Sequence, residues 1–134
     1  LSSTYKVNTL TIDTLVKKIK FENFKIIIKL DIEGAEMKAL EGAFDLIKMT
    51  SPLIIMEFSK YIFNDQSKVT FFKNFLNDFD YSIYDTNCSK INLDEIIIKL
   101  DKLNKRHKTI GNLYLIKNSS DTLGVFLENE WFSK

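Results

Sequence analysis

The sequence contains few of the residues that interrupt a chain or link structural units, with one proline and four glycines among 134 residues. No stretch rich in glycine, serine or proline is long enough to join two domains. Hydrophobic residues make up 45% of the chain, which is enough to bury one substantial core. We therefore expect residues 1–134 to form a single domain or part of one.

A charge excess and a long hydrophobic run are also lacking. The 19 lysines and arginines are balanced by 18 aspartates and glutamates, so the charge gives no indication of a nucleic-acid partner. Apolar runs such as residues 26–28 and 53–56 are far shorter than the ~20 residues that cross a bilayer. We expect neither nucleic acid nor a membrane to be a partner.

Cysteine is nearly absent. Cys88 is the single cysteine, which excludes an internal disulfide and a metal site built from several thiolates. A chain without a disulfide framework is most simply placed in the reducing cytoplasm. Because the chain starts at Leu1 with neither Met nor a signal-peptide pattern, we expect it to be part of a longer protein.

The first half of the sequence predicts two helices that alternate with two strands. Asp13 stands where it can cap a brief helix. Residues 24–30 are nearly all apolar and rich in isoleucine, which is typical of a strand covered on both faces in a parallel sheet. Apolar residues between positions 37 and 47 recur on one stripe of an amphipathic helix, and residues 53–58 form a second buried strand.

The second half continues this alternation. Phenylalanines at helical spacing around Phe72 predict a helix with a buried stripe, and residues 81–84 alternate like a strand. Asn92 can cap a third helix, and residues 113–116 form a last strand. Strands and helices that alternate with short connections predict an α/β sandwich.

Several segments of the first half carry a recognisable pattern. The first strand ends in Lys29-Leu30-Asp31-Ile32-Glu33-Gly34-Ala35-Glu36, the helix continues into Leu40-Glu41-Gly42-Ala43, and the next strand reads Pro52-Leu53-Ile54-Ile55-Met56-Glu57-Phe58. Upstream stands Leu10-Thr11-Ile12-Asp13-Thr14-Leu15. Together these segments resemble the FkbM methyltransferase family, whose motif strand ends in K-x-D-x-E-G-A-E. Beyond Ser59 the resemblance is one of architecture.

The resemblance implies the C-terminal half of a class I methyltransferase catalytic domain. Its Rossmann-like sheet is expected to be mostly parallel with an antiparallel last strand, so that residues 113–116 insert beside residues 81–84. The implied reaction is transfer of a methyl group from S-adenosylmethionine to a hydroxyl oxygen. The implied acceptor and partner is a sugar or another small molecule.

One part of the family pattern is not found in this sequence. In the family, the glycine-rich loop and the acidic residue that hold the cofactor lie upstream, whereas Gly34, Gly42, Gly111 and Gly124 do not cluster. We therefore expect the half that binds S-adenosylmethionine to be missing from this chain. We assign no cofactor-binding residue in it and expect the chain alone to be inactive.

Three carboxylates follow the ends of predicted strands, where open α/β sheets bind their ligands. Asp31 and Glu33 follow the first strand, and Glu57 lies near the end of the second. Methyl transfer needs a group that aligns the acceptor hydroxyl and takes its proton, and a carboxylate can do both. Asp31 is the first catalytic candidate, with Glu33 and Glu57 as lesser ones. Their oxygens also suit Mg²⁺ or Ca²⁺, and the residue types do not decide between these uses.

The same residues have structural interpretations. Asp31 can cap the helix that begins near Gly34, and Glu33 and Glu36 can favour the positive end of that helix. Glu36 is then expected to be solvated. Lys29 is a charged residue inside an apolar strand, and we expect it to pair with a neighbouring acid or to extend its ammonium into water.

Two functions of different classes remain open. The first is an enzyme half that supplies the acceptor side of a methyltransferase. The alternative is a non-catalytic α/β module that kept half of the sheet and associates through its edges. Without the central strand of the family, residues 25–30 become an exposed apolar edge, which invites pairing with another chain. We expect this edge to produce a homodimer or poor solubility.

Overall fold

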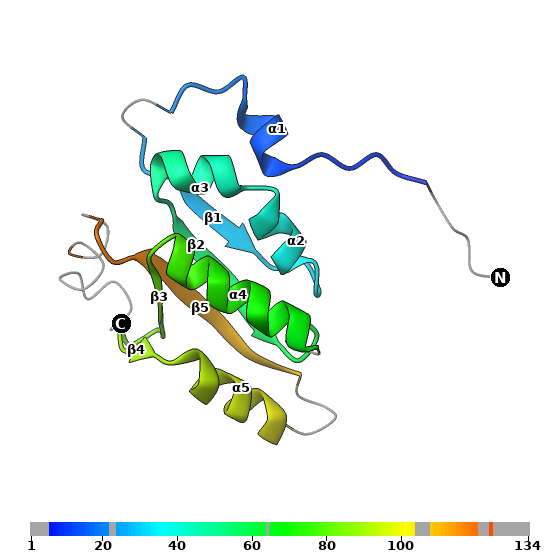
Figure 1. Ribbon diagram of the computed structural model, residues 1–134, viewed down its shortest axis with the longest axis vertical. Helices are drawn as coiled ribbons and strands as arrows, with labels where there is room; N and C mark the ends of the chain where they lie inside the picture. The colour runs from blue at the N-terminus through cyan, green and yellow to red at the C-terminus, as the bar shows by residue number, and fades with distance from the viewer. Residues whose placement is uncertain (1–5, 22–23, 64, 104–107, 121–123, 125–134) are drawn as a thin grey trace.

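The computed structural model describes residues 6–21, 24–63, 65–103, 108–120 and 124 (Figure 1). Its elements are α1 (Ile12–Val16), β1 (Ile27–Leu30), α2 (Glu36–Glu41), α3 (Phe44–Thr50), β2 (Leu53–Ser59), α4 (Gln66–Asp78), β3 (Tyr81–Tyr84), β4 (Lys90–Ile91), α5 (Leu93–Lys102) and β5 (Thr109–Lys117). The expected alternation of strands and helices is confirmed, and the protein has a mixed α/β fold.

The five strands form one sheet in the order β1-β2-β5-β3-β4. β1 is parallel to β2, whereas β5 is antiparallel to both of its neighbours, β2 and β3. β1, β2 and β3 therefore run in one direction, and the expected antiparallel last strand lies beside β3. Because β5 separates β2 from β3, the pairing of β1 with β2 is the one parallel pairing among the described strands.

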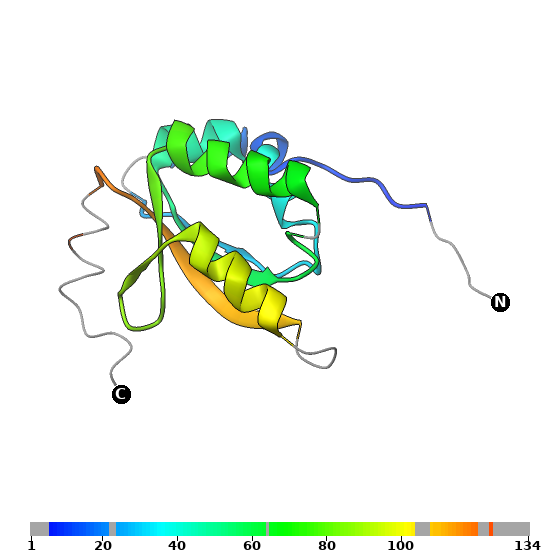
Figure 2. The ribbon, with the colours of Figure 1, turned by 60° about the horizontal axis from the view of Figure 1, so that its bottom comes forward.

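The core lies on one face of the sheet, which we call the helical face. Figures 1 and 2 show α3 and α4 lying across this face. Residues of α2, α3, α4 and α5 pack there against alternate strand residues, among them Ile28, Met56 and Leu115. Phe72 and Phe75 of α4 are fully buried within this core, which confirms the predicted apolar stripe. Phe72 also meets Phe58 of β2 edge to face, with ring centroids 5.6 Å apart.

The opposite, open face of the sheet carries a smaller apolar cluster. Tyr84, Tyr114 and Ile116 form this cluster with Leu53 and Ile55 packed against it. Its described members come from β2, β3, β5 and the Cys88 loop, so no described helix contributes to it.

The first strand is shorter and more exposed than the sequence predicts. β1 begins at Ile27, while Phe24 lies outside it with 68% of its surface exposed. Burial alternates along β1, and Ile27 on the open face is 62% exposed. The prediction of a strand covered on both faces was wrong, because the described helices that cover the sheet lie on the helical face.

The single helix predicted over residues 37–47 is divided into α2 and α3. α2 ends at Gly42, whose N–H donates to Lys38 O at 3.0 Å, and α3 starts after Ala43. Met37, Leu40 and Ile47 are nonetheless buried, so the predicted apolar stripe is retained across the break.

Asp13 caps a helix, although a different one from the helix predicted. Thr11 is the N-cap of α1, and its hydroxyl oxygen accepts a hydrogen bond from Thr14 N. The carboxylate of Asp13 instead accepts hydrogen bonds from Leu46 N at 2.9 Å and Asp45 N at 3.1 Å in the first turn of α3. The side chain therefore joins two helices that lie side by side.

The predicted cap of the third helix is confirmed. The side chain of Asn92 accepts a hydrogen bond from Asp94 N at 2.9 Å at the start of α5. Across the described residues, no helix has the length and hydrophobicity that a membrane span requires.

Candidate functional site

A tight turn follows β1 and leads into α2. Glu33 and Gly34 both have positive φ, at 56° and 100°. A Cβ added at Gly34 would lie 3.4 Å from Tyr61 Cβ, so this turn packs closely against the segment after β2. This left-handed backbone is tolerated better by glycine than by a residue such as Glu33. Asp31 lies between the end of β1 at Leu30 and this turn, directly at the carboxyl end of the strand.

The carboxylate of Asp31 is held by a lysine rather than by main-chain amides. Lys29 Nζ donates to Asp31 Oδ2 at 2.9 Å and to Asn112 Oδ1 at 3.0 Å. The N-cap of α2 is Ala35, and that helix start has no side-chain cap. The interpretation of Asp31 as a helix cap was therefore wrong, whereas the expected pairing of Lys29 with an acid is confirmed.

Glu57 reaches the same end of the open face from β2. Glu57 and Asn112 are directly opposite each other in the antiparallel pairing of β2 with β5. Asn112 in turn accepts the hydrogen bond from Lys29. The strand-end cluster, which we define as Lys29, Asp31, Glu57 and Asn112, thus combines residues from β1, β2, β5 and the turn after β1.

Glu33 is separate from this cluster in its contacts. Its side chain is exposed, and in the described part of the chain no hydrogen bond or ion pair joins it to Asp31 or Glu57. No group of three His, Cys, Asp or Glu side chains in the described segments could hold a metal ion. Asp31, Glu33 and Glu57 therefore do not form a three-ligand metal site.

The strand-end cluster is open to solvent. The side chains of Lys29 and Asp31 are 46% and 50% exposed. Ion pairs at this exposure contribute only about 0–1 kcal/mol to stability, because water and salt screen them. The role that the Lys29 contact can fill is orientation of the Asp31 carboxylate.

Glu36 was expected to be solvated, and this expectation was wrong. The side chain is fully buried, and Oε1 accepts a hydrogen bond from Ile32 N at 3.0 Å. Oε2 is buried and has no hydrogen-bond partner in the described part of the chain. Through this hydrogen bond to Ile32 N, Glu36 stabilises the turn that contains Asp31 and Glu33. In the sequence, the feature that could have indicated a specific role for Glu36 is its place as the last acid of the K-x-D-x-E-G-A-E pattern.

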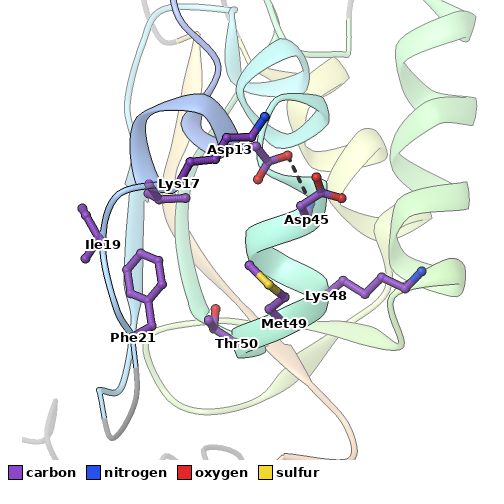
Figure 3. A pocket seen from close by; sticks show the side chains of 9 residues that line it. Asp13, Lys17, Ile19, Phe21, Asp45, Lys48, Met49 and Thr50 are labelled. Carbon is purple, nitrogen blue, oxygen red and sulfur yellow. Dashed lines mark hydrogen bonds between the residues drawn. The ribbon is translucent and has the colours of Figure 1, made fainter.

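A groove of about 660 Å³ lies elsewhere, between α1, residues 17–21 and α3 (Figure 3). The residues that line it are Asp13, Val16, Lys17, Ile19, Phe21, Asp45, Lys48, Met49 and Thr50. None of the three carboxylates predicted to be functional is among them. Both carboxylate oxygens of Asp13 accept hydrogen bonds from the first turn of α3. The position of Asp13 in this groove is therefore explained by a structural role.

Comparison with known proteins identifies the family. A family model described as the methyltransferase FkbM domain matches residues 1–83, which include β1, β2 and the strand-end turn. The chain belongs to the FkbM methyltransferase family. No curated protein and no solved structure matches it. The FkbM match supports methyl transfer as the general class of reaction.

The described residues do not fit the cofactor expected of an FkbM methyltransferase. Gly34 packs on Tyr61, Gly42 packs on Thr11, and no atom of the described residues lies near the position of an added Cβ at Gly111. These glycines therefore do not combine into a loop that cradles a ligand. The groove described above is lined by residues of α1, α3 and the segment after α1, none of which belongs to the strand-end cluster.

Proposed function

We propose that the chain is the C-terminal half of a methyltransferase catalytic domain and carries the acceptor side of a methyl transfer from S-adenosylmethionine to a hydroxyl oxygen. The acceptor would be a sugar or another small molecule. The observation that carries the proposal is the position of Asp31 at the carboxyl end of β1, where open α/β sheets bind ligands. Membership of the FkbM family supports the reaction class.

Asp31 is the proposed catalytic residue. Lys29 holds its Oδ2, and among the described residues Oδ1 has no partner, so this oxygen can accept a hydrogen bond from the acceptor hydroxyl. As the acceptor oxygen forms its new bond to the methyl carbon and the bond from that carbon to the sulfonium sulfur breaks, which would release S-adenosylhomocysteine, the hydroxyl proton would pass to the Asp31 carboxylate. Glu57 on β2, and Glu33 less directly, are candidates for contacts to other acceptor hydroxyls.

The methyl donor would be held by groups other than the described residues, because these form no cradle for it. A Rossmann-like arrangement of class I type is supported by the common direction of β1, β2 and β3 and by the antiparallel insertion of β5. A cytoplasmic location is supported by the single cysteine of the sequence.

Asp31→Asn in the complete enzyme tests the proposal. The substitution keeps the size of the side chain and removes its capacity to take a proton. We expect kcat for methyl transfer to hydroxylated acceptors to fall by about 10²–10⁴-fold, as is typical for loss of a general base. The measurement is transfer of a labelled methyl group from S-adenosylmethionine to a panel of monosaccharides and glycosides.

Glu41→Gln is the matched control, because it removes one exposed carboxylate from α2 away from the strand-end cluster. Its activity should equal that of the wild type. Unchanged turnover in Asp31→Asn would remove Asp31 from the mechanism. The alternative of a non-catalytic module would be favoured if S-adenosylhomocysteine produced no heat with the complete protein in calorimetry.

A further inference from the structure

Asn112 follows an irregularity in β5. The pairing of β5 with β2 shifts register between Phe58 and Ser59, so that Ile110 is an extra residue opposite no residue of β2. Gly111, which follows it, has a positive φ of 95°. A β-bulge of this kind interrupts the regular pairing of two strands and can re-aim a side chain beside an active site. Asn112 is the next residue, and its side chain belongs to the strand-end cluster on the open face.

The amide oxygen of Asn112 is one of two acceptors that hold the ammonium of Lys29. Lys29 Nζ donates to Asn112 Oδ1 at 3.0 Å and to Asp31 Oδ2 at 2.9 Å. A lysine carries its charge on a flexible four-carbon stem, and one contact to an exposed carboxylate orders such a side chain only weakly. Two acceptors from different parts of the sheet define the position of the ammonium better than Asp31 alone.

Glu57 is a competing partner for the same ammonium. It lies directly opposite Asn112 in the antiparallel pairing, where Cβ atoms are about 4.5–5.5 Å apart. Within the described segments, Lys29 forms an ion pair with Asp31 and none with Glu57. Asn112 therefore offers Lys29 a neutral acceptor beside Glu57. This acceptor keeps the ammonium at Asp31 and leaves the Glu57 carboxylate unpaired with this lysine.

We propose that Asn112 is a positioning residue for methyl transfer, which acts on the Asp31 carboxylate through Lys29. This inference rests on the proposed function, in which Asp31 takes the proton of the acceptor hydroxyl. Asn112 holds Lys29 and Lys29 holds Asp31 Oδ2, so Oδ1 keeps the direction in which it meets the hydroxyl. Asn112 lies outside residues 1–83, which match the family model, so the match assigns it no role.

Steady-state kinetics of the complete enzyme test the proposal, with a labelled methyl donor and the panel of monosaccharides and glycosides. Asn112→Leu keeps the approximate size of the side chain and removes the acceptor oxygen. We expect kcat to fall by about tenfold and the KM of both substrates to stay within about threefold of the wild type, because a misdirected carboxylate slows the chemical step without weakening ground-state binding. Asn112→Ala removes the same oxygen without adding apolar surface and should give the same loss.

A double-mutant cycle shows whether Asn112 acts through Lys29. Lys29→Met removes the N–H donors from a side chain of similar length, and it should lower kcat at least as much as Asn112→Leu. The variant with both substitutions should stay within about threefold of Lys29→Met, because residues that act through one another have non-additive effects. Asn74→Leu is the matched control, since Asn74 is exposed on α4, over the helical face, and kcat should not change.

Unchanged kcat in Asn112→Leu and Asn112→Ala, or in Lys29→Met, overturns the inference. So does a double variant whose loss is the product of the two single losses, because Asn112 would then act independently of Lys29. If Asp31→Asn is slow in the same assay, these outcomes leave the proposed function standing. Full turnover in Asp31→Asn overturns the proposed function itself, and the inference falls with it.

Discussion

Replacement of Asp13 by alanine tests how α1 is joined to α3. In the native structure the two carboxylate oxygens of Asp13 accept hydrogen bonds from Leu46 N at 2.9 Å and Asp45 N at 3.1 Å. Ala43, at the N-cap of α3, has no side chain that can take over these bonds. Asp13→Ala therefore leaves two main-chain N–H groups of the first turn of α3 without their partners, and we expect it to destabilise the protein.

The expected magnitude follows from the burial of the two bonds. A helix cap contributes about 1 kcal/mol, and a hydrogen bond to a charged group contributes about 1.5–3 kcal/mol when it is buried. The bond to Leu46 is partly buried and the bond to Asp45 is exposed, so we expect a loss of about 1.5 kcal/mol in the free energy of unfolding. For 134 residues, an unfolding entropy of about 0.28 kcal/mol/K converts this loss into a fall of about 5 °C in Tm.

The assay is urea unfolding and thermal unfolding followed by far-ultraviolet circular dichroism. Asp13→Asn keeps one side-chain oxygen as an acceptor and should lose about half as much stability as Asp13→Ala. Asp45→Ala is the control, because alanine retains the N–H that Asp13 binds. It should change the free energy of unfolding by less than about 0.5 kcal/mol.

Two outcomes would contradict the capping role of Asp13. If Asp13→Ala and Asp45→Ala unfolded at the same urea concentration as the wild type, the carboxylate would not stabilise the helix junction. Equal losses in Asp13→Ala and Asp45→Ala would also refute it, because they would indicate a general effect of negative charge near the start of α3.

Two further predictions concern buried ionisable side chains. Glu36→Ala should lower the free energy of unfolding by about 2–4 kcal/mol, because it empties a buried site and leaves the Ile32 N–H without its acceptor. Glu36→Gln keeps an acceptor and should lose less than half as much stability. Equal losses of the two variants in urea unfolding would contradict this prediction. Burial raises the pKa of Tyr81, whose hydroxyl donates to Pro52 O at 2.8 Å. Because an unfolded tyrosine titrates near pH ~10, the stability that Tyr81 contributes is complete below that pH and is lost as the pH rises above it. Tyr81→Phe should weaken the decline in stability at alkaline pH, and an identical decline would count against this assignment.

Much of the fold followed from local patterns in the sequence. The apolar runs at β1 and β2, the buried stripe of α4 and the Asn92 cap of α5 depend on residues a few positions apart, so the sequence displays them directly. The antiparallel insertion of β5 was expected from the family resemblance alone, because no local pattern specifies which strand pairs with which.

The position of the first catalytic candidate was also predictable, whereas its surroundings were not. Asp31 was expected at a strand end from its spacing after an apolar run. Its link through Lys29 to Asn112 joins residues 83 positions apart, and no sequence pattern predicted it. The burial of Glu36 was not predicted, because an acid in the first turn of a helix is usually solvated and only the packing of α2 shows that this one is covered.

Periodicity and motifs in short segments were enough to predict the mixed α/β class of the fold, the family and most of the order of the elements, although not the short strand β4 or the break between α2 and α3. Long-range packing was needed to show that the described helices over the sheet share one face, that Asp13 caps α3 across 33 residues, and that β1 lies at an edge among the described strands. The hydrophobic effect favours burial of an apolar side chain without specifying its partner. The packing of elements far apart in the chain therefore decides which surface covers it.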